Sequence, residues 1–422
     1  MQVAVMGFGT VGSGVVELIL KNKKSIASRS GQASLDVKRI LDIRDFSSHQ
    51  LAELFTKDFN DILNDKDIKI VVETMGGVNP AFDFVSKCLK AGKSVVTSNK
   101  ELVAAKGYEL LELAKENNVN FLFEASVGGG IPIIRPINQC LAANEFQEVA
   151  GILNGTTNFI LTKMIDEGMD FDEALKIAQA NGYAERDPSA DILGHDAARK
   201  ICILASLCFG KHVYPDEVEA EGIVNISKED VEYAKIWGGV IKLIGRAKKL
   251  ESGKISATVG PCLIKNGCQL ASVSDVFNAI LVRGDAVGDV VFYGRGAGKF
   301  PTASAVVADV IDCAKHTDKR KLIGWDDAEN DYVINPLEQS SSLYIRANVN
   351  DYNAVAEKVK ASFTDVQILE SDVKTEIAFV TPLMNEKEAR NKINALNIDV
   401  KNILRVLDYW FNSEFVMRNS EL

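Results

Sequence analysis

The chain has 422 residues, of which 46% are hydrophobic and 25% are charged, so it is long enough for two or three globular domains with sizeable cores. The formal net charge of −10 at pH 7 argues against a protein that binds nucleic acids or anionic membranes, because such proteins normally carry basic patches. The seven cysteines form no Cys-x-x-Cys pair, and no apolar run approaches 18 residues. We therefore expect a reduced, cytoplasmic protein.

Residues 1–130 alternate short apolar strands with amphipathic helices. Strands are predicted at Val3–Met6, Lys38–Leu41, Ile70–Glu73, Ser94–Thr97 and Asn120–Phe123. Helices are predicted at Val11–Leu20, Pro80–Ala91 and Lys106–Asn117. This order predicts an α/β domain with a Rossmann-type, doubly wound parallel sheet. A helix at Thr302–Lys315 is expected to return to this domain, which then includes about residues 300–318.

A glycine-rich loop follows the first predicted strand and opens the first predicted helix. Its sequence, Gly7-Phe8-Gly9-Thr10-Val11-Gly12, matches G-x-G-x-x-G in the context that this motif requires. Gly7 allows a tight turn, Gly9 lets a pyrophosphate approach the backbone, and Gly12 permits close packing of helix on strand. The alternative is an ordinary turn, but the position favours a dinucleotide site at the helix N-terminus.

The end of the second predicted strand bears on the choice of dinucleotide. Asp42-Ile43-Arg44-Asp45 places acids and a base near the expected ribose. An acid that accepts from the ribose 2′-OH favours NAD, whereas Arg44 could bind the 2′-phosphate of NADP. We predict NADP through Arg44; NAD, or simply a solvated charged turn, is the alternative.

A lysine follows the fourth predicted strand, in Thr97-Ser98-Asn99-Lys100. Ligands of open α/β sheets bind beyond the carboxyl ends of the strands, so Lys100 is expected to face the ligand. The alternative is an exposed lysine at the start of a helix.

Residues 131–299 are predicted to form an α+β substrate domain. Helices are predicted at Ile133–Ala143, Asn158–Glu167, Phe171–Asn181 and His195–Phe209. Strands are predicted at Ile255–Val259, Gln269–Val273, Asn278–Arg283 and Asp289–Gly294. The short polar turns between these strands indicate an antiparallel sheet.

The most polar stretch of the chain is residues 182–200. A proline and a glycine place Glu185 and Asp191 in a loop, where they could bind a substrate ammonium group. Asp196 and Lys200 are four residues apart on the following helix and share one face. Because apolar residues follow Lys200, it lies at the edge of a core and is a candidate proton donor. The alternative is an acidic loop beside a surface ion pair.

Two further loops are suited to close approach of a ligand to the backbone. Residues 124–132, Glu-Ala-Ser-Val-Gly-Gly-Gly-Ile-Pro, could turn carbonyl oxygens and one carboxylate towards a hard cation. Residues 151–158, Gly-Ile-Leu-Asn-Gly-Thr-Thr-Asn, present hydroxyl and N–H groups at a helix start, which suits a carboxylate. Either loop is alternatively a hinge between domains.

A linker at Pro336–Ser342 precedes a third predicted domain, residues 340–411. Its predicted elements are the strand Leu343–Val349, the helix Tyr352–Ala361, the strands Asp365–Glu370 and Thr375–Thr381, the helix Glu386–Leu396 and the strand Ile403–Val406. This βαββαβ order is the ferredoxin-like pattern.

Five segments together resemble the homoserine dehydrogenase family: residues 7–12, 97–100, 124–132, 151–158 and 185–200. They occur in order over residues 1 to about 315. The resemblance implies the NAD(P)-dependent interconversion of L-homoserine and L-aspartate 4-semialdehyde in threonine, methionine and isoleucine biosynthesis. It also implies a homodimer in which the second domain carries the dimerisation surface.

The resemblance implies roles for individual residues. Lys200 resembles the proton donor and acceptor at the substrate oxygen, and Lys100 would lie near it and near the cofactor. The substrate's polar groups would be held by Glu185, Asp191, Asp196, Gly155, Thr156 and Tyr183. A monovalent cation, Na⁺ or K⁺, would be held by Glu124, Val127, Gly129 and Ile131. The loop Gly294–Gly298, with Gly296 at its centre, resembles a second contact with the dinucleotide.

The third domain resembles an ACT domain, a module that often binds amino-acid effectors. Such modules usually carry an Arg-Pro-Gly-like turn after the first strand, but Asn350–Val355 contains neither proline nor glycine. Feedback inhibition by threonine through this domain is therefore not expected. The domain is instead expected to form subunit contacts, which could join dimers into a larger oligomer.

Two rival functions remain. A dehydrogenase of the aspartate semialdehyde type needs a thiolate nucleophile, but Cys140 and Cys202 are predicted on apolar helical faces. A non-catalytic nucleotide-sensing regulator would not need the two lysines and the acids, so an enzyme is favoured.

Overall fold

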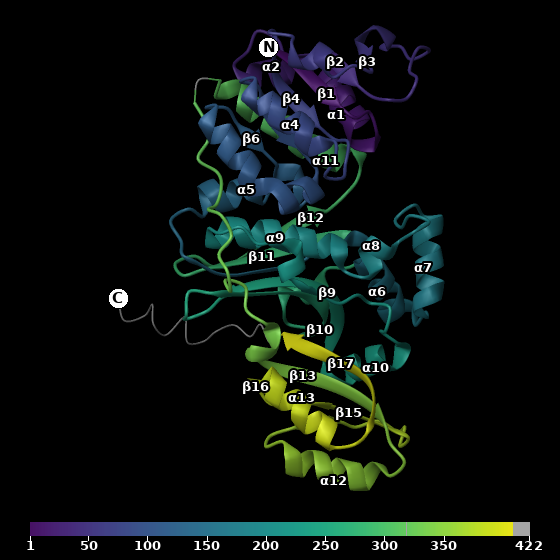
Figure 1. Cartoon of the computed structure of the whole chain (residues 1–422). Helices are drawn as coiled ribbons and strands as arrows, with labels where there is room; N and C mark the ends of the chain where they lie inside the picture. The colour runs from purple at the N-terminus through teal and green to yellow at the C-terminus, as the bar shows by residue number, and fades with distance from the viewer. Residues whose placement is uncertain (318, 408–422) are drawn as a thin grey trace. The chain divides into compact units, whose positions relative to one another are not determined.

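The computed structural model describes residues 1–317 and 319–407, which form two compact units (Figure 1). The first unit contains residues 1–149, 199–218 and 282–332. The second contains residues 150–198, 219–281 and 333–407. Residues 199–218 and 282–332 thus belong to the nucleotide-binding part, a division that differs from the three predicted domains.

The first unit is built on a six-stranded parallel sheet with the order β3-β2-β1-β4-β5-β6. The strands are β1 (Gln2–Met6), β2 (Asp36–Leu41), β3 (Phe55–Thr56), β4 (Ile68–Glu73), β5 (Ser94–Thr97) and β6 (Phe121–Leu122). This order is that of the dinucleotide-binding fold, with the change of direction between β1 and β4. The predicted Rossmann-type sheet is confirmed.

The helices of this unit are α1 (Thr10–Lys21), α2 (Lys23–Ser30), α3 (Asn60–Leu63), α4 (Ala81–Lys90), α5 (Lys100–Glu116) and α11 (Lys299–Lys315). The predicted return of α11 is confirmed, because it packs on α1 and its Val306 and Val310 share a buried core with Val3 and Val5. Gly14 permits the contact, since a Cβ there would lie 3.2 Å from the Cβ of Ala303.

The helix α5 begins six residues earlier than predicted. The side chain of Asn99 accepts a hydrogen bond from the backbone N–H of Leu102 at 3.1 Å. Asparagine is a favoured N-cap residue, and its cap makes Lys100 the first residue of the helix.

The second unit holds α6 (Gly155–Glu167), α7 (Phe171–Ala180), α8 (Ser189–Ile192) and α10 (Lys228–Trp237), and the strands β8 (Glu219–Ala220), β9 (Gly239–Lys249) and β10 (Ile255–Lys265). β9 and β10 pair antiparallel along their whole length. The boundary between the units passes through α9 (His195–Phe209), β7 (Phe146–Ile152) and β11 (Phe277–Gly284). β12 (Gly288–Arg295) follows β11 and begins the strand order β12-β11-β7-β9-β10-β17-β13-β15-β14.

Two predicted elements of this region are wrong. Gln269–Val273 forms a 3₁₀ turn at Gln269–Ser272 instead of a strand. The predicted helix Ile133–Ala143 is reduced to a π-helical turn at Pro136–Cys140. Proline lacks the N–H that an interior helical residue donates, which explains the interruption. β7, β9 and α10 were not predicted.

The ferredoxin-like order of the C-terminal part is confirmed. Its elements are β13 (Ser340–Asn348), α12 (Tyr352–Ser362), β14 (Gln367–Leu369), β15 (Glu376–Val380), α13 (Glu386–Ala395) and β17 (Asp399–Leu407), with the short β16 (Met384–Asn385) beside β13. The strand order β17-β13-β15-β14 is antiparallel throughout. β17 also pairs with β10 in parallel, which joins this module to the rest of the second unit. Predicted residues 408–411 lie outside the described chain.

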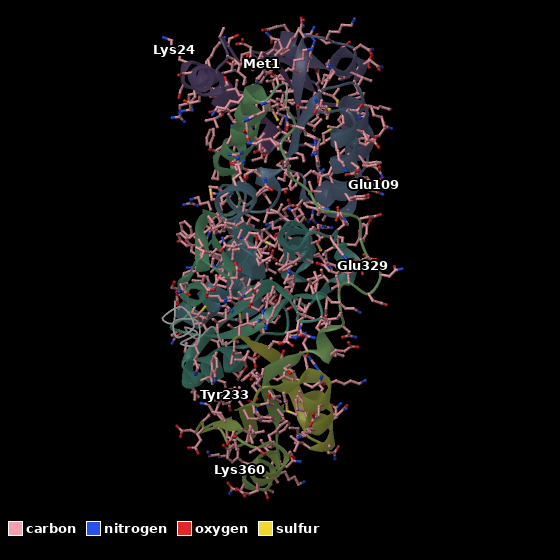
Figure 2. The ribbon with its side chains drawn as sticks, turned by 90° about the vertical axis from the view of Figure 1, so that its left-hand side faces the viewer. Met1, Lys24, Glu109, Tyr233, Glu329 and Lys360 are labelled. Atoms are coloured by element: carbon pink, nitrogen blue, oxygen red, sulfur yellow. The ribbon has the colours of Figure 1, made fainter. Side chains whose placement is uncertain are left out.

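Charged side chains are exposed on both units, as at Lys24, Glu109, Glu329 and Lys360 (Figure 2). No helix among the described residues combines the length and low polarity needed to span a membrane.

Candidate active site

The glycine loop connects β1 to α1 in the geometry that a dinucleotide requires. Gly7 has a φ of +91°, and a Cβ on Gly12 would lie only 1.9 Å from the carbonyl oxygen of Gly7. At Gly9, in contrast, an added Cβ meets no atom within 4 Å. Gly9 is the N-cap of α1 and has no side-chain cap, so the helix N-terminus keeps N–H groups that can face phosphates. These residues fit a dinucleotide.

Thr74, just after β4, is a part of this loop that the sequence analysis did not identify. Its hydroxyl donates to the carbonyl oxygen of Gly7 at 2.9 Å, and its backbone N–H donates to Met6 at 2.9 Å. The adjacent Glu73 is fully buried and accepts from the Thr97 hydroxyl at 2.6 Å and from the Met75 N–H at 2.7 Å. Burial raises the pKa of Glu73 above its ordinary value. The ends of β1, β4 and β5 are thus tied together beside the loop.

Asp42 and Arg44 form a bidentate ion pair after β2. The two hydrogen bonds from the guanidinium measure 2.9 and 2.8 Å, and the backbone N–H of Phe8 donates to the same carboxylate at 2.7 Å. Arg44 lowers the pKa of Asp42 well below its usual range. Asp42 therefore holds both the glycine loop and the arginine, while Arg44 remains 56% exposed and accessible to a ligand.

The predicted acids come together at the N-terminus of α6. The side-chain amide of Asn154, the N-cap of α6, donates to Asp191 at 2.7 Å and to Asp196 at 2.9 Å, while its oxygen accepts from the Thr157 N–H at 2.9 Å. Asp196 is 4% exposed and Lys200, one turn later on α9, is 8% exposed. An amide that bridges two acids beside a helix N-terminus forms a compact polar site.

Lys100 and Lys200 both belong to the first unit. Their sequence neighbours Glu101 and Arg199 form an ion pair of 3.2 Å, so the first turn of α5 lies beside Arg199 of α9. The segment that follows α9 also contacts α5, because His212 Nε2 lies 3.0 Å from the Ala104 oxygen. The predicted proximity of the two lysines is consistent with these contacts.

Glu185 does not join the acid cluster. It is exposed, and among the described residues its carboxylate has no hydrogen-bond or ion-pair partner. Tyr183 is 43% exposed and lies beside α6, where its ring packs on Phe159 at 5.0 Å and its carbonyl oxygen accepts from the Thr156 hydroxyl at 2.6 Å. Tyr183 and Thr156 are thus adjacent.

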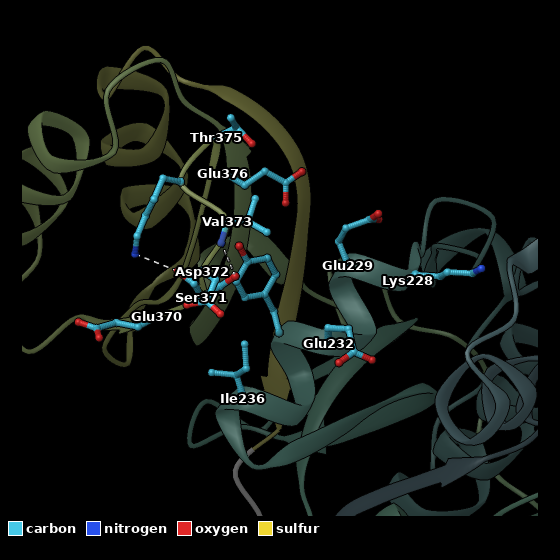
Figure 3. A pocket seen from close by; sticks show the side chains of 12 residues that line it. Lys228, Glu229, Glu232, Ile236, Glu370, Ser371, Asp372, Val373, Thr375 and Glu376 are labelled. Carbon is cyan, nitrogen blue, oxygen red and sulfur yellow. Dashed lines mark hydrogen bonds between the residues drawn. The ribbon is translucent and has the colours of Figure 1, made fainter.

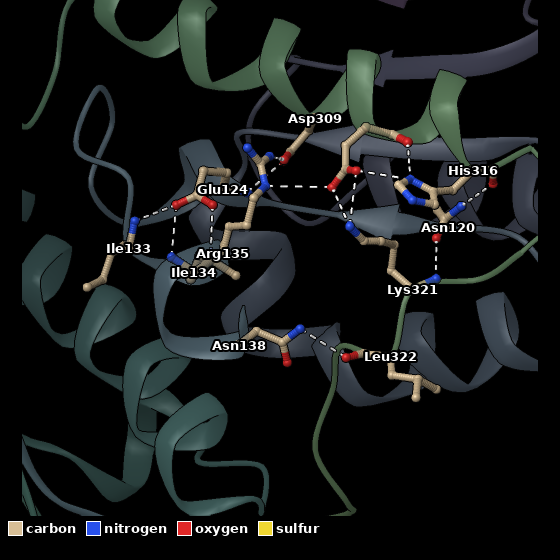
Figure 4. A network of polar contacts seen from close by, with 11 residues as sticks. Asn120, Glu124, Ile133, Ile134, Arg135, Asn138, Asp309, His316, Lys321 and Leu322 are labelled. Carbon is tan, nitrogen blue, oxygen red and sulfur yellow. Dashed lines mark hydrogen bonds and ion pairs between the residues drawn. The ribbon is translucent and has the colours of Figure 1, made fainter. Parts of the chain in front are cut away.

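The carboxylate of Glu124 binds backbone N–H groups (Figure 4). It accepts from Ile133 at 2.6 Å, from Ile134 at 2.8 Å and from Arg135 at 2.8 Å. The N–H of Glu124 in turn donates to Asp309 on α11 at 2.8 Å, and Asp309 pairs with the Arg135 guanidinium. Burial and the nearby Glu124 raise the pKa of Asp309 to about 7. A cation in this loop would therefore depend chiefly on carbonyl oxygens.

The second glycine-rich loop lies against the loop of residues 124–132. The N–H of Gly130 donates to Arg295 at 3.0 Å, and a Cβ on Gly129 would lie 2.2 Å from the Gly296 oxygen. Lys299, just after this second loop, pairs with Glu17 of α1 at 2.7 Å. Gly296 therefore lies in the unit that carries the glycine loop of β1 and α1.

A cavity of about 890 Å³ lies in the second unit, between α10 and the β14–β15 loop (Figure 3). It is lined by Tyr233 and Ile236 and by several acids, including Glu229 and Asp372. No predicted site residue lines it, so it does not identify the catalytic centre.

The cysteines do not supply a nucleophile at this site. Burial raises the pKa of Cys88 and Cys262 to about 12 and that of Cys202 further. Cys140 is exposed, contrary to prediction, because the predicted helix around it is interrupted.

Lys242 of β9 gives a prediction about stability. It is 2% exposed and donates to Val273 at 2.7 Å and to Asn158 at 3.2 Å. Burial lowers its pKa from 10.5 to about 8, so between these values the folded state binds fewer protons than the unfolded state. The free energy of unfolding should therefore rise, relative to a Lys242→Met variant, by up to about 3 kcal/mol between pH 8 and 10.5. Urea titrations at both pH values measure this difference, and parallel pH profiles would contradict it.

Known proteins match nearly the whole chain. Residues 7–124 match the family model described as "Homoserine dehydrogenase, NAD binding domain", and residues 132–311 match "Homoserine dehydrogenase". A homoserine dehydrogenase of Helicobacter pylori is 39% identical over 420 residues and 97% of each chain. The structure of a homoserine dehydrogenase from Thiobacillus denitrificans is similar with a TM-score of 0.85, at 35% identity over 97% of this chain and 98% of that one. The structure of a hyperthermophilic archaeal homoserine dehydrogenase in complex with NADPH is similar with a TM-score of 0.62, at 30% identity over 74% of this chain and 97% of that one.

The sheet order and the glycine loop are those of a dinucleotide-binding domain, and the family model that matches residues 7–124 identifies an oxidoreductase that uses a nicotinamide dinucleotide. The second family model matches residues 132–311, and the relatives cover nearly the whole chain, so the similarity includes the substrate domain as well. The chain belongs to the homoserine dehydrogenase family.

Proposed function

We propose that this protein interconverts L-homoserine and L-aspartate 4-semialdehyde with a nicotinamide dinucleotide. One observation carries the proposal: Asn154 binds both Asp191 and Asp196 at the N-terminus of α6. Asp196 lies on α9, one helical turn before Lys200. Both substrates carry an α-carboxylate, an α-ammonium group and an oxygen at the reacting carbon. The N-terminus, the acids and the lysine provide complementary groups for all three.

The backbone would hold the substrate carboxylate. The N–H groups of Gly155 and Thr156 begin α6, a helix of 13 residues, where the partial positive charge favours an anion. A Cβ on Gly155 would lie 2.8 Å from the Val276 oxygen, so glycine is needed at this position. Asp191 and Asp196 then attract the ammonium group, and Tyr183 borders the same end of α6.

Lys200 would manage the proton at the substrate oxygen. When bound, the nicotinamide supplies or accepts the hydride. Negative charge grows on the aldehyde oxygen during reduction, and the Lys200 ammonium group stabilises this charge and donates the proton. In oxidation the neutral amine accepts the hydroxyl proton, so higher pH favours this direction. Asp196 on the same helix face orients the amine, and we assign Lys100 to the cofactor side of the reaction.

We assign NADP as the preferred cofactor because Arg44 is exposed and held by Asp42 at the end of β2. The archaeal relative that binds NADPH is consistent with this assignment. We expect Arg44→Ala to lower kcat/KM for NADP by about 10-fold or more while changing that for NAD less than 3-fold, since a charge-assisted bidentate contact is lost only with the 2′-phosphate. Initial rates at 340 nm with each cofactor measure this, and an equal loss with both cofactors would remove the assignment.

Three further assignments follow from the family. A monovalent cation would be held by the carbonyl oxygens of Val127, Gly129 and Ile131 near Glu124. The active form would be a cytoplasmic homodimer. The C-terminal module would act as an ACT-like domain in subunit contacts, and its βαββαβ order supports this.

The test of the proposed activity is a rate measurement with homoserine and each cofactor, followed at 340 nm. Steady turnover that requires both substrates supports the proposal. Nucleotide binding without turnover of homoserine or the semialdehyde would instead favour the regulator.

A further inference from the structure

One buried polar side chain beside the substrate site lacks a partner. Asn278 of β11 is 3% exposed, and its Oδ1 atom accepts no hydrogen bond. Nor does its amide nitrogen have a partner among the described residues. A buried polar group without a hydrogen bond is costly and uncommon in folded proteins. An amide in this state therefore calls for a partner from outside the chain.

The position of Asn278 is fixed by its surroundings. Asn158 of α6 donates to the carbonyl oxygens of Val273 at 3.2 Å, Asp275 at 3.0 Å and Phe277 at 3.0 Å. Its own side-chain oxygen accepts from Lys242. Asn158 is thus fully engaged and fastens the segment before Asn278 to the first turn of α6. The backbone that carries the unpartnered amide of Asn278 is therefore held in place.

The amide is directed at the start of α6. A Cβ built on Gly155, the first residue of that helix, lies 3.4 Å from Asn278 Oδ1. The helix N-terminus attracts an anion, whereas an amide oxygen accepts N–H groups and repels a carboxylate. A ligand that satisfies both must carry an anionic group and an N–H donor next to each other. The head group of an α-amino acid has this composition.

We propose that Asn278 binds the α-ammonium group of the amino-acid substrate and selects for it against acids that lack the amine. The inference rests on the proposed function. It adds to that function a residue from β11 that no motif of the sequence identifies. Asn278 and the acids Asp191 and Asp196 then hold the ammonium group, while the N-terminus of α6 holds the carboxylate.

The test replaces Asn278 with leucine, which has a similar volume and no polar group. We expect KM for homoserine to rise about 10- to 100-fold, the range for the loss of a hydrogen bond to a charged group, with kcat and KM for the nucleotide within 3-fold of wild type. The melting temperature of the ligand-free protein should be unchanged or higher, because an unsatisfied amide has been removed. Asn158→Leu is the matched control and should lower it. If Asn278→Leu fails to fold, Asn278→Ser tests the same KM.

Competitive inhibitors separate the ammonium group from the rest of the substrate. The inhibition constant of L-2-aminobutyrate should rise in the variant by the same factor as KM, and that of butyrate should not change. An unchanged KM for homoserine, or an equal effect on both inhibitors, would overturn the assignment and leave Asn278 as the site of a buried water. If the wild-type protein oxidises no homoserine with either cofactor, the proposed function itself fails.

Discussion

Replacing Lys200 with methionine is expected to lower kcat for homoserine oxidation by about 10²- to 10⁴-fold, the usual contribution of a positioned acid or base. Methionine keeps the unbranched stem at a position that is 8% exposed, so the fold of α9 should be retained. KM for the nucleotide should change little, because the glycine loop is untouched. Stopped-flow or steady-state rates at 340 nm measure the loss.

The charge and the proton of Lys200 can be separated. Lys200→Arg keeps a cation near Asp196 but cannot release a proton, so oxidation should stay slow even at high pH. Lys235→Met removes a lysine that is 44% exposed and pairs with Glu232 on α10, and should leave kcat unchanged. If Lys200→Met and Lys235→Met had similar kcat values, Lys200 would have no part in the chemistry.

The sequence predicts the bounds of an element correctly where neighbouring residues alone determine them. β5 occupies the four residues predicted, Ser94–Thr97, because a β-branched run is bounded by polar residues. α9 begins and ends where predicted, at His195 and Phe209, because a glycine precedes it and its apolar face is continuous. The glycine loop of β1 and α1 was recognisable because its motif depends only on neighbours in the chain.

Two local signals in the sequence account for differences between the predicted and the observed helices. Pro136 interrupts the apolar periodicity of residues 133–143, and the helix predicted there is confined to Pro136–Cys140. Asn99 is a good N-cap residue, and α5 starts directly after it. β9 was missed for a different reason: a buried Lys242 breaks the apolar pattern, and its partners Val273 and Asn158 are distant in sequence.

The site itself depends on contacts between distant segments. Asp191 and Asp196 were predicted as candidates, but their bridge through Asn154 could not be, because the amide lies 37 residues before the first of them. Glu185 is also acidic and precedes Asp191 closely in the sequence, yet it is exposed and does not join them. Asn278 stands in an apolar strand, where sequence offers no reason to single out its amide.

Alanine at Gly12 and alanine at Gly9 are both expected to weaken nucleotide binding, but only alanine at Gly12 should also destabilise the fold. A Cβ on Gly12 would lie 1.9 Å from the Gly7 oxygen and 2.7 Å from the Thr74 hydroxyl, so the loop or α1 must move. Overpacking of this kind typically costs about 1–3 kcal/mol. Gly12→Ala should therefore lower the melting temperature and abolish measurable nucleotide binding together.

Gly9→Ala is the matched control for the effect on the fold, and it tests directly whether the glycine loop binds the pyrophosphate. Gly9 has φ −77° and ψ −158°, which alanine adopts readily, and its Cβ would meet nothing within 4 Å. The melting temperature should therefore stay near that of wild type. The methyl group nevertheless fills the space that the pyrophosphate needs, so the dissociation constant for NADPH, measured by fluorescence titration, should rise at least about 10-fold. Normal affinity in Gly9→Ala would show that the phosphates bind elsewhere, and normal stability in Gly12→Ala would show that helix and loop are not packed as closely as these distances require.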